Sequence, residues 1–592
     1  MAGLNFLIKK EKIDQQKIKT IAVGCLLPEI QKYSEYYYQN NIIINAIMSE
    51  NYPVYKYEDE KIIILIEGMI YNFSDSEILD KIKEVNFNDI LIDINSIKKM
   101  ITSFEGEYNI SIYNKVLNKL FFFNDSLGRL PTYYSLGETK IITRNYNFIV
   151  NTIENTEINK ESLIEYLLFE FFISENTLFN NIYKFLPGTI LFIDINKNEH
   201  VKENVEINFD SYIKDKNWDK MDEVFIKLFN DRLNKINKNK ILISLSGGLD
   251  SRGTLSAIIK NSVVPQAVNF NAPWLNPNEM NYAKNLADIF NIKITVVDLN
   301  DKYYDKWIEY IIKCKPGLYR VGNEYFYEFL NKVHEIYNSE YVFFSGLYGG
   351  EFTRYSDLTS GISNLDDLVE YLCVKNADGY YFPIKHVSNI LNIDEDSIKK
   401  YIYSKIEKLP EENVYNKFKH YIFEKHRNWA GENEDRTRQF YWTITPYFSQ
   451  SFLSQINGIK ESEKNTKNFV KFLAKIDSRN INSDHYNGVT LTSYFGLSFL
   501  SIVESFAKNA LFRRLIASFY RKFMYKNIDN KEIIDKIHNL LITMNNTKLI
   551  DVNYLKKCID ITSDTWHLTR IYTLLLIFDS YEKTSKNSHA NN

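Results

Sequence analysis

Apolar runs alternate with an amphipathic segment along residues 241–344. The four runs have the length of buried strands and stand at residues 241–245, 267–270, 293–297 and 341–344. Between the second and third runs, apolar residues recur at the spacing of one helix face, namely Ala283, Leu286, Ala287 and Phe290. This alternation of strands and helices predicts a doubly wound α/β domain around a parallel sheet.

Two glycine pairs follow the first and last of these predicted strands. Glycine is scarce, at 21 of 592 residues, so the context of each pair is informative. Gly247-Gly248 comes directly after the run at 241–245, and Gly349-Gly350 comes shortly after the run at 341–344. In an open parallel sheet, ligands bind at the carboxyl ends of the strands, so both loops are candidate ligand sites.

The first loop, Ser246-Gly247-Gly248-Leu249-Asp250-Ser251, carries groups suited to phosphate binding. Its small residues let backbone N–H groups approach an anion, and a following helix would add the positive end of its dipole. Asp250 supplies a carboxylate for Mg²⁺, and Ser246 and Ser251 supply hydroxyl donors. The alternative is an ordinary strand-to-helix turn with a capping aspartate. The loop fits neither the P-loop nor the dinucleotide fingerprint.

Composition excludes several classes of protein. The chain is 45% hydrophobic and 25% charged with a formal charge of −3, which favours folded domains and gives no basic excess for nucleic acid. Neither a signal peptide nor an apolar run of membrane-spanning length is evident, so no membrane association and a cytoplasmic location are expected. The four cysteines lie far apart, at Cys25, Cys314, Cys373 and Cys558, so free thiols are expected.

The first loop resembles the pyrophosphate-binding loop of the PP-loop ATP pyrophosphatases, and further motifs resemble the asparagine synthetase family. Glu67-Gly68-Met69-Ile70-Tyr71-Asn72 is similar to the family's NGEIYN, and the segment 124–134 is similar to its RDRFGIKPLYY. The resemblance implies a four-layer αββα, glutaminase-like (Ntn) domain over residues 1–208. It also implies a doubly wound, Rossmann-like PP-loop synthetase domain with a helical C-terminal part over residues 209–592.

The family's N-terminal nucleophile is a cysteine directly after the initiator Met, where this chain has Ala2. Alanine has no nucleophilic atom, so a thioester with glutamine cannot form by this route. Glu67 stands where the family has its oxyanion-hole Asn, and its charge would oppose an oxyanion. The Arg-containing stretch that holds glutamine has no clear match between residues 44 and 60. The prediction is a degenerate domain that persists as a scaffold.

For the synthetase site, the resemblance implies ATP bound with Mg²⁺ across the strand ends. Residues 246–251 would hold pyrophosphate, while the adenosine side would be lined by Leu245, Phe270, Ser345 and Gly346. The second loop, at residues 345–351, resembles the loops of lasso-peptide cyclases and β-lactam synthetases when one inserted residue is allowed. In that register, Glu351 shares the metal with Asp250.

Two further residues are catalytic candidates by resemblance. Tyr348 falls near the catalytic tyrosine of the β-lactam synthetases, with a packed aromatic as the alternative. Lys467 opens a stretch similar to the family's KxxLR, whose lysine stabilises the reacting acyl phosphate. An exposed lysine is the alternative there, because lysine is common in this chain.

These features lead to an ATP-dependent amide-forming ligase of natural-product, peptide or glycan biosynthesis as the leading hypothesis. It would adenylate the carboxylate of a small molecule or peptide and join it to an amine, either a substrate amine or ammonia, with biosynthetic partner proteins possible. One alternative is asparagine synthetase, driven by ammonia, or by glutamine if Ala2 were an engineered change from cysteine. Another alternative is a catalytically silent scaffold paralogue.

Overall fold

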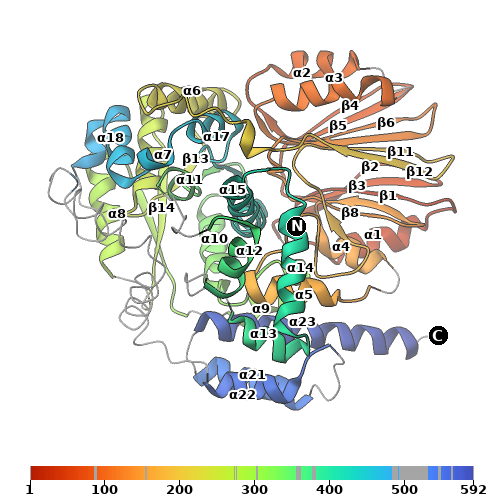
Figure 1. Ribbon diagram of the computed structural model, residues 1–592. Coiled ribbons are helices and arrows are strands. Elements are labelled where there is room, and N and C mark those ends of the chain that lie inside the picture. The colour runs from red at the N-terminus through yellow and green to blue at the C-terminus, as the bar shows by residue number, and fades with distance from the viewer. Residues whose placement is uncertain are drawn as a thin grey trace.

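Two six-stranded antiparallel sheets lie face to face in the N-terminal part of the chain (Figure 1). The computed structural model describes residues 2–590 except residues 28, 86–89, 154–155, 273, 275–276, 302–303, 355–361, 376–381, 483–490, 492–530, 544–548 and 562–564. The first sheet has the order β10 (Tyr183–Lys184), β8 (Tyr133–Leu136), β9 (Lys140–Thr143), β1 (Gly3–Ile8), β3 (Ile42–Met48) and β2 (Lys32–Gln39). The second has the order β12 (Glu199–Asn204), β11 (Thr189–Asp194), β7 (Lys119–Asn124), β6 (Gly106–Asn114), β5 (Ile62–Ile70) and β4 (Val54–Glu58).

Helices cover the outer face of each sheet, so the N-terminal part has four layers (Figure 1). The helices α2 (Asp75–Lys83) and α3 (Ile90–Ser103) pack on the second sheet, and α1 (Gln15–Val23) and α4 (Tyr146–Thr152) pack on the first. A capping box between Ser74 and Glu77 begins α2. Apolar side chains that alternate along the strands fill the space between the sheets. The predicted αββα arrangement is confirmed.

The second half of the chain contains a parallel sheet of five strands. Its order is β15 (Ile294–Asp298), β14 (Gln266–Asn271), β13 (Ile241–Ser244), β16 (Val342–Phe344) and β17 (Trp442–Ile444), and every neighbouring pair is parallel. The four strands predicted from the apolar runs are therefore present, within one or two residues of their expected ends. The strand β17 was not predicted.

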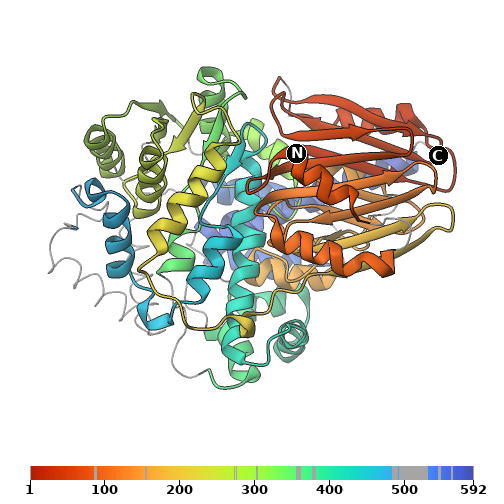
Figure 2. The same ribbon diagram turned by 90° about the horizontal axis from the view of Figure 1, so that it is seen from above.

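Helices cover both faces of the parallel sheet (Figure 2). Ile241 and Ile243 face one helical layer, whereas Leu242 faces the other, as the pleat of a strand requires. The first layer contains α6 (Met221–Leu233), α7 (Leu249–Lys260), α8 (Pro277–Phe290), α17 (Gln450–Asn457) and α18 (Thr466–Ile476). The second contains α9 (Asp305–Cys314) and α10 (Glu324–Ile336). The predicted apolar face of the segment 283–290 is buried against the sheet.

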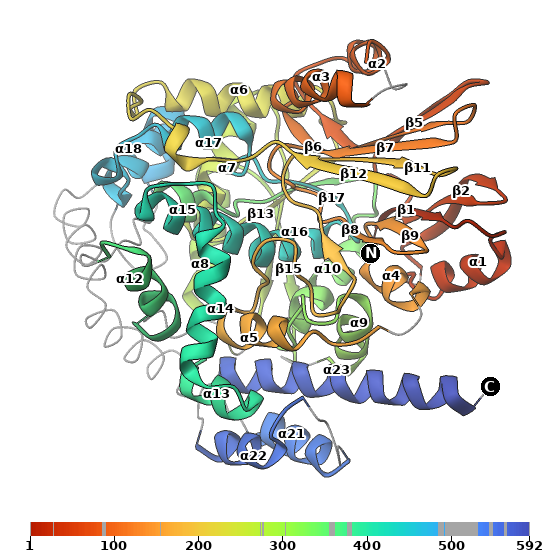
Figure 3. The ribbon, with the colours of Figure 1, turned by 45° about the vertical axis from the view of Figure 1, so that its right-hand side comes forward.

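A further group of helices, drawn mostly from the C-terminal half, shares a hydrophobic core with the first antiparallel sheet (Figure 3). These helices are α5 (Lys160–Phe169), α12 (Leu365–Glu370), α13 (Ile384–Leu391), α14 (Glu395–Glu407), α15 (Val414–Lys425), α21 (Lys531–Thr543), α22 (Val552–Ile561) and α23 (Thr565–Ala590). The buried apolar side chains of α23 between Leu568 and Phe578 belong to this core.

The structure bears on the cysteines and on the apolar character of the helices. All four cysteines are buried and free of disulfide bonds, as expected. Among the helices of the described residues, none combines the length and the apolar character needed to cross a bilayer.

Candidate active site

The two glycine-containing loops meet where the strand order of the parallel sheet reverses. The strands β14 and β15 lie on one side of β13, and β16 and β17 lie on the other. The loop at residues 245–248 leaves β13, and the loop at residues 345–348 leaves β16. Such a reversal is the position at which open α/β sheets bind their ligands. The structure therefore brings together the two loops that the sequence had singled out.

Hydrogen bonds hold the first loop in a tight turn ahead of α7. The Ser246 N–H donates to Ser251 Oγ at 3.2 Å, and the Gly248 N–H donates to Ser246 Oγ at 3.2 Å. Gly248 is the N-terminal cap of α7, and no side chain in the described part of the chain caps the helix there. The turn thus places the positive end of α7 beside the strand ends, an arrangement suited to an anion.

Glycines in the second loop allow its backbone to approach the first loop closely. A β-carbon at Gly346 would lie 2.8 Å from the Ser251 backbone nitrogen. A β-carbon at Gly349 would lie 2.7 Å from the Asp250 Oδ1. Both distances are shorter than real β-carbon contacts, so any side chain at either position would push the loops apart. The second loop therefore helps to place the Asp250 carboxylate.

The Asp250 carboxylate is half-buried and forms an ion pair with Arg354, with 2.6 Å between Oδ1 and Nη2. Burial raises the pKa of Asp250, while Arg354 and a hydrogen bond from the Gly350 N–H act in the opposite direction. Arg354 follows α11 (Gly349–Thr353), the short helix that begins in the second loop. The predicted metal position is thus occupied on one side by a guanidinium group.

Glu351 lies close enough to Asp250 for the two carboxylates to influence each other. Burial raises the pKa of Glu351, and the negative charge of Asp250 raises it further. Two carboxylates can hold Mg²⁺ when phosphate oxygens and water complete its coordination. No group of three or more His, Cys, Asp or Glu side chains in the described residues could hold a metal ion by itself. A metal held by these two carboxylates together with phosphate stays a prediction.

Tyr348 points into the protein core and away from solvent. Its side chain is fully buried, packs against Phe352 and Phe448, and carries a hydroxyl with no hydrogen-bond partner within the described residues. Its φ of +72° is in the left-handed region, which is unusual for a bulky residue. In this conformation, Tyr348 has the surroundings of a packing residue, and a catalytic role stays a prediction.

The remaining predicted residues lie around the two loops with different exposure. Leu245 is buried beneath the first loop, and the Ser345 N–H donates to the Ile444 carbonyl oxygen at 3.0 Å. The half-buried Phe270 ring contacts Phe329 of α10, with centroids 5.1 Å apart. Lys467 is half-buried in the first turn of α18. Their roles toward a nucleotide and an acyl group stay predictions.

Two residues of this region were missed by the sequence interpretation. Arg354 stands three residues after Glu351, and a cation so close to a suspected phosphate site was a usable signal. Tyr447 donates a hydrogen bond from its hydroxyl to the Asp250 carbonyl oxygen at 3.2 Å. Its ring lies against Gly253 of α7. Both residues fix the position of Asp250, one through its side chain and one through its backbone.

The N-terminal site differs from an open glutaminase pocket, because Ala2 is only 1% exposed. Glu67 is buried beside it and accepts hydrogen bonds from Tyr52 at 2.8 Å and from Asn109 at 3.3 Å. The Arg144 Nε lies 3.4 Å from the Glu67 Oε1. Burial raises the pKa of Glu67, although Arg144, Tyr52 and Asn109 oppose this shift. The negative charge foreseen at Glu67 is therefore balanced by a neighbouring cation.

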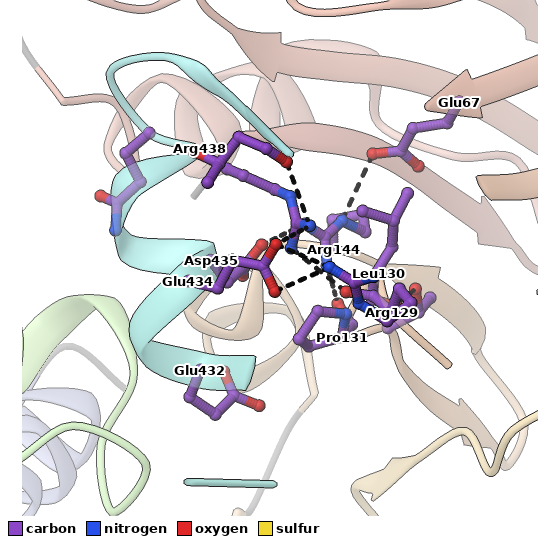
Figure 4. Close-up of polar contacts among 12 residues, drawn as sticks. Glu67, Arg129, Leu130, Pro131, Arg144, Glu432, Glu434, Asp435 and Arg438 are labelled. Atoms are coloured by element: carbon purple, nitrogen blue, oxygen red, sulfur yellow. Dashed lines mark hydrogen bonds and ion pairs between the residues drawn. The ribbon is translucent and has the colours of Figure 1, made fainter. Parts of the chain in front are cut away.

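An alternating chain of buried charges runs from Glu67 into the second half of the protein, and Figure 4 shows its part from Glu67 through Arg144 to Asp435. Arg144 pairs with Asp435, Asp435 pairs with Lys315 at 2.7 Å, Lys315 pairs with Glu432, and Glu432 pairs with Lys184 at 2.6 Å. We call these six residues the charge chain. All six side chains are at most 3% exposed. Two of these paired side chains, Glu67 and Arg144, lie against Gly3, next to residue 2.

A second buried group lies beside the charge chain and also joins the two halves of the protein (Figure 4). Arg129 pairs with Glu107 at 3.2 Å and with Glu434 at 2.7 Å. Glu434 also pairs with Arg438 at 2.7 Å. Glu432, Glu434 and Asp435 all belong to α16 (Gly431–Thr437), so one short helix carries the acids of both groups. The N-terminal domain is therefore fixed to α16 by buried ion pairs.

Comparison with known proteins identifies the N-terminal domain only. Residues 42–204 match the family model described as a glutamine amidotransferase domain, so this chain carries a glutamine amidotransferase-like domain. No curated protein matches the chain. Among solved structures, the chain is similar to the NMN synthetase from Francisella tularensis at 13% identity, over 38% of this chain and 97% of that chain, with a TM-score of 0.20. A TM-score this low carries no weight for a shared fold.

Proposed function

We propose that this protein is an ATP-dependent amide-forming ligase that adenylates a carboxylate and joins it to an amine. The observation that carries the proposal is the meeting of two glycine-containing loops at the reversal of the parallel sheet, with Asp250 and Glu351 at their junction. Loop amides and the N-terminus of α7 suit pyrophosphate, and the two carboxylates would hold Mg²⁺. The first loop would therefore act as a PP-loop.

The reaction would proceed in two steps. A carboxylate oxygen of the substrate attacks the α-phosphorus of ATP, and the bond to the bridging oxygen breaks, so that pyrophosphate leaves. The amine nitrogen then attacks the acyl carbon, AMP leaves with the electrons of the C–O bond, and the amine releases a proton. Carboxylate and amine do not condense unaided at neutral pH, and the adenylate must be shielded from water. Lys467 would stabilise the charge that develops on the acyl phosphate.

The amine would come from the substrate or from free ammonia, and not from glutamine. Ala2 lacks a nucleophile and is buried, and Glu67 and Arg144 pack against the neighbouring Gly3. The N-terminal domain would then act as a scaffold that holds α16 in place. An amine acceptor of this kind fits a role in the biosynthesis of natural products, modified peptides or glycans, with a small-molecule or peptide carboxylate as the acyl substrate.

Exchange of labelled pyrophosphate into ATP tests the first step without knowledge of the amine. The full-length protein is incubated with Mg²⁺, ATP and a panel of carboxylates. We expect exchange that requires a carboxylate and is lost in Asp250→Asn. Asp231→Asn is the matched control, because this aspartate also forms an ion pair at 2.6 Å but lies on the surface of α6. Exchange that persists in Asp250→Asn would contradict the proposal.

A further inference from the structure

Arg354 combines two features that a simple structural ion pair does not need. Its guanidinium binds one of the two carboxylates that the proposed function assigns to Mg²⁺, with 2.6 Å between Arg354 Nη2 and Asp250 Oδ1. Both side chains remain partly exposed, at 18% for Arg354 and 27% for Asp250. A ligand that enters between the two loops can therefore reach both groups. An ion pair that a ligand can reach is able to open when a stronger partner arrives.

The surroundings of Arg354 accommodate its guanidinium group. A β-carbon at Gly350 would lie 2.5 Å from the Arg354 Nη2, so glycine at this position leaves room for the guanidinium. The guanidinium carbon of Arg354 lies 4.9 Å from the centre of the Phe469 ring of α18, at cation–π distance. Gly349 makes room for the Asp250 carboxylate in the same way. The Gly349-Gly350 pair is therefore explained by the two partners of one ion pair.

We propose that Arg354 is a triphosphate ligand that exchanges partners when nucleotide binds. Without nucleotide it neutralises Asp250, and with Mg²⁺ and ATP its guanidinium moves to phosphate oxygens while Asp250 turns to the metal. Mg²⁺ bound at Asp250 would repel the Arg354 guanidinium, which lies 2.6 Å from Oδ1, and phosphate oxygens offer the guanidinium another anionic partner. Guanidinium groups bind phosphate oxygens through paired N–H donors, and this supplies the new contact. The inference rests on the proposed function, because it assumes ATP at this site.

Crossed variants separate this role from a structural one. Equilibrium dissociation constants of the full-length protein are measured for ATP without Mg²⁺, for ATP with Mg²⁺ and for adenosine. We expect Arg354→Gln to weaken ATP binding without Mg²⁺ by about tenfold or more, and adenosine binding to stay unchanged. We expect Asp250→Asn to keep or improve ATP binding without Mg²⁺, and to lose the gain that Mg²⁺ gives the wild type. The two variants should therefore differ in opposite ways: Arg354→Gln loses affinity for ATP without Mg²⁺, and Asp250→Asn loses the gain in affinity that Mg²⁺ provides.

Arg479→Gln is the matched control for the loss of a paired, stacked arginine. Arg479 pairs with Asp477 at 2.6 Å, and its guanidinium carbon lies 4.5 Å from the Phe290 ring, at the far end of α8 from the proposed site. The Arg479→Gln variant should therefore bind ATP as the wild type does. If Arg354→Gln does not fold, Arg354→Lys carries the test, because lysine keeps the charge but loses the paired donors, and an intermediate affinity is expected.

The outcomes distinguish failure of this inference from failure of the proposed function. Equal weakening of ATP and adenosine binding in Arg354→Gln would mean a structural role and would overturn the inference alone. Unchanged ATP binding in that variant would also overturn it. A wild-type protein that binds neither ATP nor adenosine would overturn the proposed function, and the inference with it.

Discussion

Asp435 occupies the centre of the charge chain, so its neutralisation is the sharpest test of the link between the two halves of the protein. The charge chain holds three acids and three bases, which balance. Burial by itself would raise the pKa of Asp435, but Arg144 and Lys315 hold that pKa well below its ordinary value. The variant Asp435→Asn keeps the shape of the side chain and leaves one uncompensated positive charge in a dry interface. Arg144 then keeps the Glu67 carboxylate at 3.4 Å as a charged partner and the Pro131 carbonyl oxygen as a neutral one.

The size of the expected destabilisation follows from the burial of the ion pairs that Asp435 makes. Removing one partner of a buried ion pair destabilises a protein by about 3–5 kcal/mol. An unfolding entropy of roughly 2.1 cal/mol/K per residue gives about 1.2 kcal/mol/K for a chain of 592 residues that unfolds as one unit. The midpoint of thermal unfolding should therefore fall by about 2–4 °C in Asp435→Asn. Calorimetry at neutral pH measures this shift directly.

Two further variants decide whether the lost charge balance causes the destabilisation of Asp435→Asn. Asp231→Asn removes the half-buried partner of an ion pair whose lysine, Lys227, is 73% exposed, and it should change the unfolding free energy by less than about 1 kcal/mol. The double variant Arg144→Gln with Asp435→Asn restores neutrality, so it should be less destabilised than the sum of the two single variants. An unchanged midpoint in Asp435→Asn, or strictly additive losses in the double variant, would refute this reasoning.

Three other predictions follow from particular contacts. Gly349→Ala should weaken Mg²⁺-dependent ATP binding by about tenfold or more, because its β-carbon would meet the Asp250 carboxylate. The control variant Gly137→Ala, whose β-carbon meets nothing within 4 Å, should bind ATP as the wild type does. Equal affinities of the two variants would contradict this. Ala2→Cys should release no glutamate from glutamine, because residue 2 is 1% exposed and Glu67 and Arg144 pack against the neighbouring Gly3; glutamate release would refute a closed site. Glu165 lies in α5, and burial raises its pKa to about 7 from 4.5. The folded protein therefore favours the protonated carboxyl group. This stabilisation is present below about pH 4.5 and is lost as the pH rises through 7. The unfolding midpoint of the wild type should therefore fall, relative to that of Glu165→Gln, between pH 5 and 8, by the equivalent of about 3 kcal/mol, and a constant difference would contradict this.

The sequence predicted the parallel sheet because its strands are buried on both faces and therefore appear as apolar runs. The runs at 241–245 and 267–270 correspond to β13 and β14 within one residue at each end. The strand β17, Trp442–Ile444, has only three residues, and it was missed although the aromatic residues Phe440 and Tyr441 directly precede it. The positions of the two glycine-containing loops followed from the strands, because loops at the ends of parallel strands share one edge of the sheet.

The buried charges could not be predicted from the pattern of residues. The segment 431–438, Gly-Glu-Asn-Glu-Asp-Arg-Thr-Arg, has the composition of a solvated helix, yet Glu432, Glu434 and Asp435 are at most 1% exposed. Apart from Arg438, their charged partners stand more than 100 residues away in the chain. Arg129, Arg144 and Lys184 come from the N-terminal domain and Lys315 from the second half, so only tertiary packing brings them together. Burial of a charged helix depends on what covers it, and local sequence does not contain that information.

The central claim is that the two loops at the reversal of the parallel sheet bind ATP for adenylation. Its most direct test is ATP turnover by the full-length protein with Mg²⁺ and a panel of carboxylates and amines, with AMP plus pyrophosphate resolved from ADP plus phosphate. We predict AMP and pyrophosphate in equal amounts, dependent on a carboxylate and abolished in Asp250→Asn. Formation of ADP and phosphate, or turnover that survives in Asp250→Asn, would contradict the account.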